Sequence, residues 1–407
     1  MIFLNKIGPN MNIAVTEKIE IITFSSLYPN SAQPNHGVFL QNRLGYLMAT
    51  GHVRGRVVAP VPWFPFSGSI FGRYSVYAKV GAEEVRAGIH VDYPKFTLLP
   101  KIGMTLTPGA IFRSALPVLK RLQQERDFDL IDAHYFYPDG VAAVRLGQVL
   151  NKPVVVTAHG TDLNLIPEYP RPRRMIQEAA RGADGIIAVS QALKDAIVAL
   201  GVPDGEVTVL RNGVDLKLFH PEAREASRKE FKLNGPTLLS VGLLIPRKGH
   251  ELVIGALPAL PEYTLLIIGQ GPERANLERL AIRLKVDHRV RFLGGVPHHE
   301  LHKYYSAADA FVLASSREGL PCVLPESIAC GTPVVASNIW GNPEVVCRPE
   351  AGVLMKERTS EAVVEAVQRL FRQLPDRRAT RHYGEEFGWD STAQGQLRLI
   401  QDVLRKR

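Results

Sequence analysis

Two glutamates, Glu318 and Glu326, are the residues whose type and spacing point most directly to chemistry. The first follows an apolar, strand-like run at 310–316, and the second falls on a short helix predicted to start near Pro321 and to end before Gly331. At ~1.5 Å per residue, such a helix places Glu326 roughly 7–8 Å beyond its start. Two carboxylates at that offset can accept hydrogen bonds from a sugar and from a ribose, with phosphates between them at the helix N-terminus. The alternative is one glutamate favoured by the helix dipole and a second that is simply solvated, and this segment alone does not separate the two.

A histidine and two cations follow two other predicted strands. His159 comes directly after the apolar run 154–158, and ligands of α/β proteins gather at the carboxyl ends of parallel strands. A histidine there can hydrogen-bond a sugar hydroxyl or a developing oxyanion; otherwise it satisfies loop carbonyls. Arg247 and Lys248 follow the run 237–241, where cations can bind diphosphate oxygens and stabilise a departing nucleotide. The alternative of a solvated basic pair is weakened because positive charge is unfavourable at a helix start.

Three further segments carry weaker signals. Gly37 lies in a loop before an amphipathic helix and can let backbone N–H groups approach phosphates, although a plain turn explains it equally well. Gly-Gln-Gly at 269–271 is a truncated dinucleotide fingerprint with Arg274 in place of its third glycine, which disfavours a nicotinamide-dependent dehydrogenase. Asp-Phe-Asp at 127–129 has the form of a metal-binding motif but is better explained as polar residues bounding a buried strand, so we predict no catalytic metal.

Four more segments accompany the Glu-x7-Glu element. In chain order they are Ala-His-Gly-Thr-Asp at 158–162, Val-Leu-Arg-Asn-Gly-Val-Asp at 209–215, Ser-Val-Gly-Leu-Leu-Ile-Pro-Arg-Lys-Gly at 240–249 and Ile-Gly-Gln-Gly-Pro at 268–272. With these five motifs the sequence resembles the retaining GT-B glycosyltransferases of family four, over about residues 19–400. It is most similar to the branch that builds exopolysaccharide or teichuronic-acid-like cell-surface polymers.

The resemblance implies a role for each of these residues. His159 matches the family's donor-sugar histidine, Glu318 would orient the sugar hydroxyls, Glu326 the ribose, and Arg247 and Lys248 the diphosphate. Further donor-binding positions are Gly37, the main chain of Val296 beside the nucleotide base, and the loop residues Gly319, Leu320, Pro321 and Cys322.

The chain departs from the family pattern at two positions. The arginine that usually follows the glycine after the first strand of the second domain is Leu243 here. Either Arg247 replaces that arginine in space or phosphate binding rests more on Lys248. One glycine of the family's Gly-Gly-like loop is His36, so only Gly37 carries over.

Composition indicates a two-domain globular protein. With 407 residues the chain is too long for one ordinary core, and 45% hydrophobic and 22% charged residues are ordinary for a soluble protein. No apolar run reaches the ~20 residues that span a bilayer, and the start lacks a signal-peptide core, although Met11 is an alternative to Met1 as first residue. Three cysteines without metal spacing suit a reducing cytosol. The net charge of +9 has no long basic block, which argues against nucleic-acid binding.

Apolar runs alternate with helical periodicity, as in parallel α/β sheets. Strands are expected at 19–25, 129–134, 153–158, 185–190, 207–210, 237–241, 263–268, 289–293, 310–314 and 333–336, with helices that include 274–285, 298–308 and 360–374. We predict an α/β, GT-B fold of two facing Rossmann-like domains with parallel sheets and an interdomain cleft. Residues 1–215 would form the acceptor-side domain, joined by a crossing helix at 386–407, and residues 216–385 the nucleotide-sugar-binding domain.

The predicted function is metal-independent transfer, with retention, of a hexose-type sugar from a UDP- or GDP-linked donor to a glycan or polyprenyl-linked acceptor in surface polysaccharide synthesis. No cofactor besides this nucleotide-sugar substrate is expected. The protein would be cytoplasmic, and its apolar segment 61–66 either contacts the inner membrane peripherally or packs over the first domain. The segment 135–140, rich in tyrosine, would line the acceptor side. The alternatives are a nucleotide-sugar hydrolase or epimerase on the same fold, and a non-catalytic sugar-nucleotide-binding protein.

Overall fold

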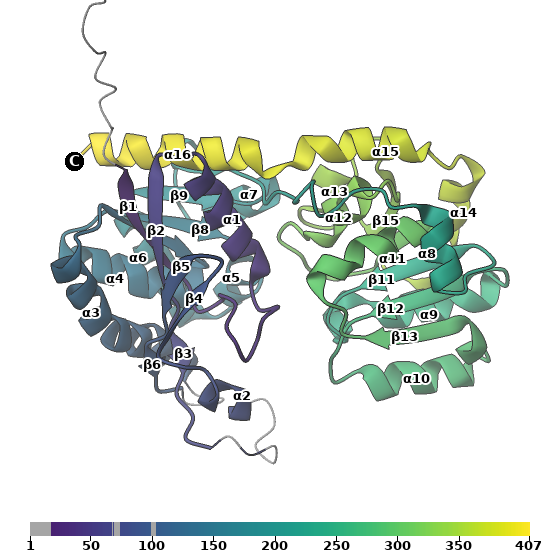
Figure 1. The fold of residues 1–407 in the computed structure, drawn as a ribbon, viewed down its shortest axis with the longest axis horizontal. Coiled ribbons are helices and arrows are strands. Elements are labelled where there is room, and N and C mark those ends of the chain that lie inside the picture. The colour runs from purple at the N-terminus through teal and green to yellow at the C-terminus, as the bar shows by residue number, and fades with distance from the viewer. Residues whose placement is uncertain (1–17, 67, 69–73, 99–102) are drawn as a thin grey trace, which may run out of the picture.

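The computed structural model describes residues 18–66, 68, 74–98 and 103–407. They form two α/β domains that lie side by side, with the C-terminal helices running across both (Figure 1). This is the predicted architecture of two Rossmann-like halves with parallel sheets. Both candidate start residues, Met1 and Met11, lie outside the described part of the chain.

An eight-stranded sheet organises the N-terminal domain, in the order β10-β9-β8-β7-β1-β2-β5-β4. Its strands pair in parallel except β4 with β5. Every residue of β8 is buried, which fits its Val-Val-Val-Thr-Ala sequence and a sheet covered by helices on both faces. The strands are β1 (Ile19–Phe24), β2 (Val53–Val58), β4 (Glu83–Arg86), β5 (Ile89–Asp92), β7 (Leu130–His134), β8 (Val154–Ala158), β9 (Gly185–Ala188) and β10 (Val207–Val209). A separate pair is formed by β3 (Val61–Pro62) and β6 (Lys95–Phe96).

A six-stranded, wholly parallel sheet organises the C-terminal domain, in the order β13-β12-β11-β14-β15-β16. Its strands are β11 (Thr237–Val241), β12 (Thr264–Ile268), β13 (Val290–Gly294), β14 (Ala310–Leu313), β15 (Val334–Ser337) and β16 (Gly352–Met355). Strands β11 and β14 are neighbours in this sheet. Their carboxyl ends lead into the loops with the residues predicted to bind the diphosphate and the sugar. Parallel pairing therefore brings those two loops to the same edge.

Helices pack on both faces of each sheet. In the N-terminal domain they are α1 (Val38–Ala49), α2 (Tyr74–Ala78), α3 (Thr107–Glu125), α4 (Val141–Leu150), α5 (Thr161–Asn164), α6 (Pro170–Gly182) and α7 (Gln191–Ala199). In the C-terminal half they are α8 (Arg224–Glu230), α9 (His250–Ala256), α10 (Arg274–Arg283), α11 (Leu301–Ala307), α12 (Val323–Ala329), α13 (Asn342–Val345), α14 (Ser360–Arg372), α15 (Arg377–Gly384) and α16 (Trp389–Arg405). No helix in the described part of the chain combines the length and apolar character needed to cross a bilayer.

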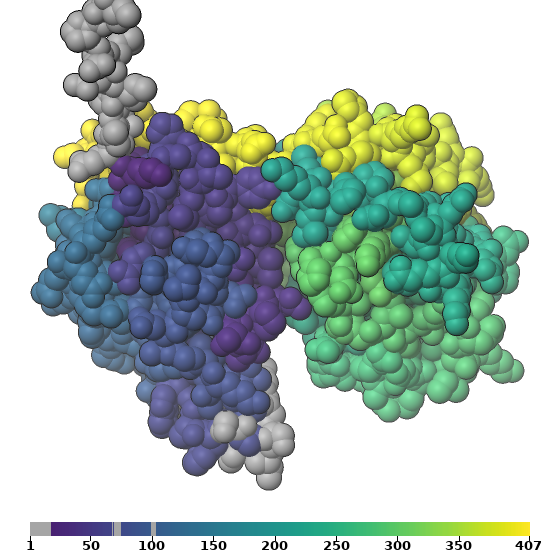
Figure 2. Space-filling model, in the orientation of Figure 1, coloured from purple at the N-terminus to yellow at the C-terminus, as the bar shows by residue number. Residues whose placement is uncertain are grey.

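The chain returns to its first domain at its C-terminal end. Helix α16 packs against α1, and the ring of Trp389 stacks on Tyr46 with centroids 6.1 Å apart. Just before α16, Phe387 accepts a backbone hydrogen bond of 2.8 Å from Val214 in the linker between the sheets. The space-filling view shows the domains touching next to α16 and diverging towards α2 and α10 (Figure 2).

The predicted elements are present, with ends that mostly shift by one or two residues. The strand at 237–241 is reproduced as β11. Helix α12 begins at Val323, two residues later than expected, so Glu326 lies in its first turn and closer to the helix start than the rise estimate assumed. The helix expected at 298–308 is divided into a 3-10 turn, His298–Glu300, followed by α11.

Candidate active site

Glu318 forms the centre of a charged cluster at the carboxyl edge of the C-terminal sheet. Lys248 Nζ lies 2.6 Å from one carboxylate oxygen and Arg247 Nη1 3.3 Å from the other, while the Glu318 side chain is only 8% exposed. Burial alone would raise the pKa of Glu318, but the two cations outweigh it and hold that pKa below its usual value. The carboxylate is therefore ionised and oriented, and each oxygen keeps a lone pair that can accept a hydroxyl.

Arg247 and Lys248 differ in how many of their N–H donors remain available to a ligand. Arg247 also donates to the carbonyl of Arg317 at 2.7 Å, so its guanidinium braces the loop that carries Glu318. The Lys248 ammonium has three N–H donors, and among the described residues its side chain donates only to Glu318. Leu243, at the position of the family's arginine, is 59% exposed and contributes no charge. Lys248 is thus the better-placed cation for a phosphate.

Each carboxylate oxygen of Glu326 has one protein partner and keeps a lone pair for a ligand. His298 Nε2 lies 2.9 Å from one of its oxygens, and the Tyr305 hydroxyl donates to the other at 3.1 Å. Burial would lower the pKa of His298, but the Glu326 carboxylate outweighs it and raises that pKa. Since His298 follows Val296 by two residues, the contact ties the loop after β13, predicted to hold the base, to the residue predicted to hold the ribose. Sequence reasoning missed both partners, because a lone histidine and a lone tyrosine carry no motif.

His159 is buried in the N-terminal domain, directly after β8. Its ring packs against Phe39 and Tyr135, with centroids 5.1 and 5.3 Å away, and Nε2 lies 3.1 Å from His134 Nδ1. Burial, with His134 and Arg43 nearby, lowers the pKa of His159 well below its usual value. The imidazole is therefore neutral near pH 7. Tyr135 has φ of 74°, a left-handed conformation that is costly for a bulky residue and is typical of functional sites.

The two domains touch where His159 and Glu318 meet. A side chain on Gly319 would place its Cβ 1.8 Å from the His159 carbonyl oxygen, so only glycine permits this approach. Asn164 Nδ2 also donates to the Glu318 carbonyl at 3.2 Å across the same gap. The structure therefore brings His159, the predicted donor-sugar histidine, close to the loop that carries the charged cluster of the other domain.

The remaining predicted donor residues lie at the ends of other strands and helices. Leu320 and Pro321 are buried, and Cys322 stands before the first residue of α12, where burial raises the pKa of its thiol to about 12. Val296 is half-buried just beyond β13. Gly37 immediately precedes α1 with φ of 73°, two residues before the Phe39 ring that contacts His159, and a Cβ there would lie 2.3 Å from a backbone oxygen.

The Asp-Phe-Asp segment lies away from this site, at the amino end of β7. Asp127 pairs with Lys152 at 2.8 Å, and Asp129 accepts the backbone N–H of Glu20 at 2.8 Å. Both carboxylates therefore have structural partners. Within the described residues, no group of three or more His, Cys, Asp or Glu side chains could hold a metal ion.

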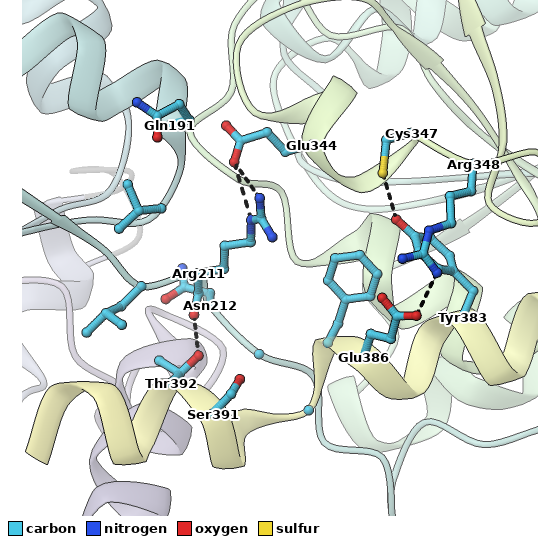
Figure 3. A pocket seen from close by; sticks show the side chains of 15 residues that line it. Gln191, Arg211, Asn212, Glu344, Cys347, Arg348, Tyr383, Glu386, Ser391 and Thr392 are labelled. Carbon is cyan, nitrogen blue, oxygen red and sulfur yellow. Dashed lines mark hydrogen bonds and ion pairs between the residues drawn. The ribbon is translucent and has the colours of Figure 1, made fainter. Parts of the chain in front are cut away.

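A cavity of about 570 Å³ lies at the domain junction, between the linker and α15–α16 (Figure 3). Its charged side chains are already paired: Arg211 with Glu344 at 3.2 Å and Arg348 with Glu386 at 2.7 Å. The cavity is separate from the Glu318 cluster and offers no free charge to a phosphate.

Comparison with known proteins agrees with this geometry. The family model "Glycosyltransferase Family 4" matches residues 75–218, and "Glycosyl transferases group 1" matches residues 222–387. TuaC of Bacillus subtilis (strain 168), named as a teichuronic acid biosynthesis glycosyltransferase, is 30% identical over 86% of this chain and 89% of its own. A mycobacterial relative from Mycobacterium tuberculosis, named GDP-mannose-dependent alpha-(1-6)-phosphatidylinositol monomannoside mannosyltransferase, is 29% identical over 62% of this chain and 69% of its own.

Solved structures share the whole fold. Sucrose-phosphate synthase from Thermosynechococcus elongatus superimposes with a TM-score of 0.77 at 20% identity, over 96% of this chain and all of that one. HepE from Anabaena, solved in complex with UDP, gives a TM-score of 0.71 at 20% identity, over 95% and 100% of the two chains. The fold is thus that of the GT-B glycosyltransferases. With its TuaC-like sequence, the chain belongs to glycosyltransferase family 4.

Proposed function

We propose that this glycosyltransferase moves a hexose-type sugar from a UDP- or GDP-linked donor to a glycan or lipid-linked acceptor, with retention of configuration and without a metal. The proposal rests mainly on one observation: the loop that carries Glu318, the partner of Lys248, meets the main chain of His159 at the contact between the domains. One side offers a cation for the diphosphate and an ionised acceptor for sugar hydroxyls; the other offers a neutral imidazole. HepE, a fold relative, is described with UDP and with UDP-glucose.

In this proposal the protein supplies positioning and electrostatics rather than a nucleophile. The Glu318 carboxylate is held by two cations, which lowers its nucleophilicity, and the Cys322 thiol stays protonated because its pKa is raised. Lys248 and Arg247 stabilise the charge that develops on the departing nucleotide. The donor phosphate then accepts the acceptor's proton on the same face, which retains the configuration.

The proposed setting is synthesis of a surface polysaccharide or glycolipid at the cytoplasmic face of the inner membrane. Support comes from the names of the relatives, which refer to teichuronic acid and to a phosphatidylinositol mannoside. Support also comes from exposed apolar side chains near β3 and α3, namely Trp63, Phe66, Met104 and Leu106. Such a surface can contact a lipid headgroup region or a polyprenyl chain.

Product analysis tests the proposal. The purified protein is first screened by thermal shift against UDP-, GDP- and ADP-sugars, and the stabilising donor is then incubated with a polyprenyl-linked glycan acceptor. An elongated glycan with the donor's anomeric configuration supports the proposal. Release of free sugar regardless of acceptor would indicate a hydrolase, an altered sugar would indicate an epimerase, and binding without any product would indicate a non-catalytic binding protein.

A further inference from the structure

His159 ends a chain of buried hydrogen bonds that reaches the crossing helix α16. Its other members are Arg43 of α1, Gln396 of α16, and Asp132 and His134 of β7, none of them more than 1% exposed. These residues come from three elements that are distant in sequence. None of them belongs to the motifs that indicate donor binding.

The direction of each hydrogen bond follows from the chemistry of its ends. Arginine can only donate, and Arg43 Nε donates to Gln396 Oε1 at 2.7 Å. The amide is thereby oriented so that Gln396 Nε2 donates to Asp132 Oδ2 at 2.8 Å. The same carboxylate oxygen lies 3.2 Å from His134 Nε2. Since this oxygen acts as an acceptor, His134 carries its proton on Nε2.

That proton fixes the next ring as well. A neutral His134 with Nε2–H has a bare Nδ1, which lies 3.1 Å from His159 Nε2. His159 must then donate from Nε2, which leaves its own Nδ1 without a proton. This Nδ1 is buried and has no hydrogen-bond partner among the described residues. An unpartnered buried acceptor is costly, and a ligand hydroxyl would satisfy it.

The buried chain already joins a guanidinium, Arg43, to a carboxylate, Asp132, through the Gln396 amide. A neutral His134 adds no further charge to this dry environment. Two other buried carboxylates near β7 have their own donors: Asp162 accepts backbone N–H groups of residues 136, 159 and 160, the shortest at 2.7 Å, and Asp139 accepts the backbone N–H of Ser26 at 3.0 Å.

We propose that Asp132 and His134 are positioning residues that hold His159 in its Nε2–H tautomer, so that His159 meets the sugar as a hydrogen-bond acceptor through Nδ1. This inference rests on the proposed role of His159 in the donor site and makes that role specific. In this tautomer, His159 Nδ1 accepts a hydrogen bond from a sugar hydroxyl, and it cannot donate a hydrogen bond to a developing oxyanion.

Nitrogen NMR on the unliganded protein reads the tautomer without any assay of activity. The protein is labelled with ¹⁵N-histidine, and the His159 and His134 signals are assigned by their loss in His159→Gln and His134→Asn. The expected pattern for His159 near pH 7 is a protonated Nε2 and an unprotonated Nδ1. The reverse pattern, or a doubly protonated His134, overturns the proposal.

Kinetics with two side chains of similar size test the consequence. His134→Leu removes the acceptor for His159 Nε2–H. We expect kcat to fall about 10- to 100-fold, by analogy with residues that orient metal-binding histidines, with the donor KM changed less than about 2-fold. His134→Asn places a carbonyl oxygen near the former Nδ1 and should recover most of kcat. Equal losses in both variants, with normal melting temperatures, contradict the proposal.

His159→Ala separates failure of this inference from failure of the proposed function. If His159→Ala keeps wild-type turnover, the proposed role of His159 itself is wrong. If His159→Ala is impaired while His134→Leu is fully active, only the positioning role is wrong. Should His134→Leu fail to fold, the NMR pattern of the wild-type protein still decides the tautomer.

Discussion

Replacing Lys248 by methionine removes the closest cation from the Glu318 carboxylate while keeping the length of the side chain. The side chains of Lys248 and Glu318 are nearly buried, 12% and 8% exposed, and Lys248 Nζ lies 2.6 Å from Glu318 Oε1. After the change Glu318 retains one cation, Arg247, at 3.3 Å. We expect the variant to be less stable, because a buried carboxylate loses its better partner.

The expected loss of stability depends on the burial of Glu318 and on its remaining partner, Arg247. Removing one member of a fully buried ion pair costs about 3–5 kcal/mol. Because Arg247 stays in place and the pair is slightly exposed, we expect a loss of roughly 2–3 kcal/mol in the free energy of unfolding at pH 7. In the folded wild type the pKa of Glu318 is lowered from its unfolded value near 4.5, so the ionised carboxylate stabilises the fold above that pH. This stabilisation is lost as the pH falls through the folded-state pKa. The difference between variant and wild type should therefore shrink below about pH 4.5, as Glu318 becomes protonated.

Chemical denaturation at pH 7.5 and at about pH 3.5, below the unfolded pKa of Glu318, measures both effects, with Lys194→Met as matched control. Lys194 pairs at 3.0 Å with Asp204, which is 73% exposed, so its loss should cost less than about 1 kcal/mol at either pH. In a Glu318→Gln background, Lys248→Met should cost roughly 2 kcal/mol less than in the wild type. Equal destabilisation at both pH values, and additivity with Glu318→Gln, would refute the reasoning.

Three other predictions follow. Glu326→Ala should weaken binding of the free nucleotide diphosphate and of the nucleotide sugar alike, by about 1.5–3 kcal/mol, because charge-assisted hydrogen bonds to ribose are lost. Unchanged affinity for both ligands in titration calorimetry would show that Glu326 has a structural role only. Burial, opposed by hydrogen bonds from Ser26, raises the pKa of Asp139 to about 7. The wild type should therefore lose stability relative to Asp139→Asn as the pH rises from 5 to about 8, by up to about 3 kcal/mol, with no further change above; a pH-independent difference in unfolding free energy would contradict this. EDTA should leave activity unchanged, because Lys248 and Arg247 supply the positive charge at the diphosphate and the 127–129 carboxylates have other partners; loss of turnover that a divalent ion restores would show that a metal is needed.

The sequence predicted best those strands and site residues that depend on local residue patterns. Continuous apolar runs predicted the buried parallel strands, and β11 has the predicted bounds because its Thr-Leu-Leu-Ser-Val sequence is buried throughout. Glu318, Lys248 and His159 could be named because each follows such a strand, and parallel strands end at the same edge of a sheet. Whether these residues bind a donor stays a prediction.

Other features depend on contacts that no local pattern contains. The partners of Glu326, His298 and Tyr305, come from different elements and meet it only through the packing of the second sheet. The contact of Gly319 with His159 joins residues 160 positions apart, and its glycine requirement arises only when the domains meet. The buried Arg43 and Gln396 are polar residues on amphipathic helices, which sequence patterns assign to solvent. Four strands of the two large sheets were not among those named from the sequence: β2, β4, β5 and β16. Antiparallel β4 has no continuous apolar run, because its Glu-Glu-Val-Arg sequence lies at a half-exposed sheet edge.

The turnover of His159→Ala and Glu318→Gln, measured beside their affinity for the bare nucleotide, tests the central claim that both domains act on the donor sugar. Each variant should lose 10²-fold or more in kcat, equivalent to about 2.7 kcal/mol of transition-state stabilisation, because its contacts strengthen as the glycosidic bond lengthens. Nucleotide affinity should barely change, since neither residue is assigned to the nucleotide, and the melting temperature of His159→Ala should stay normal. A folded His159→Ala enzyme with near wild-type turnover would contradict the account, because the N-terminal domain would then lack its proposed contact with the reacting sugar.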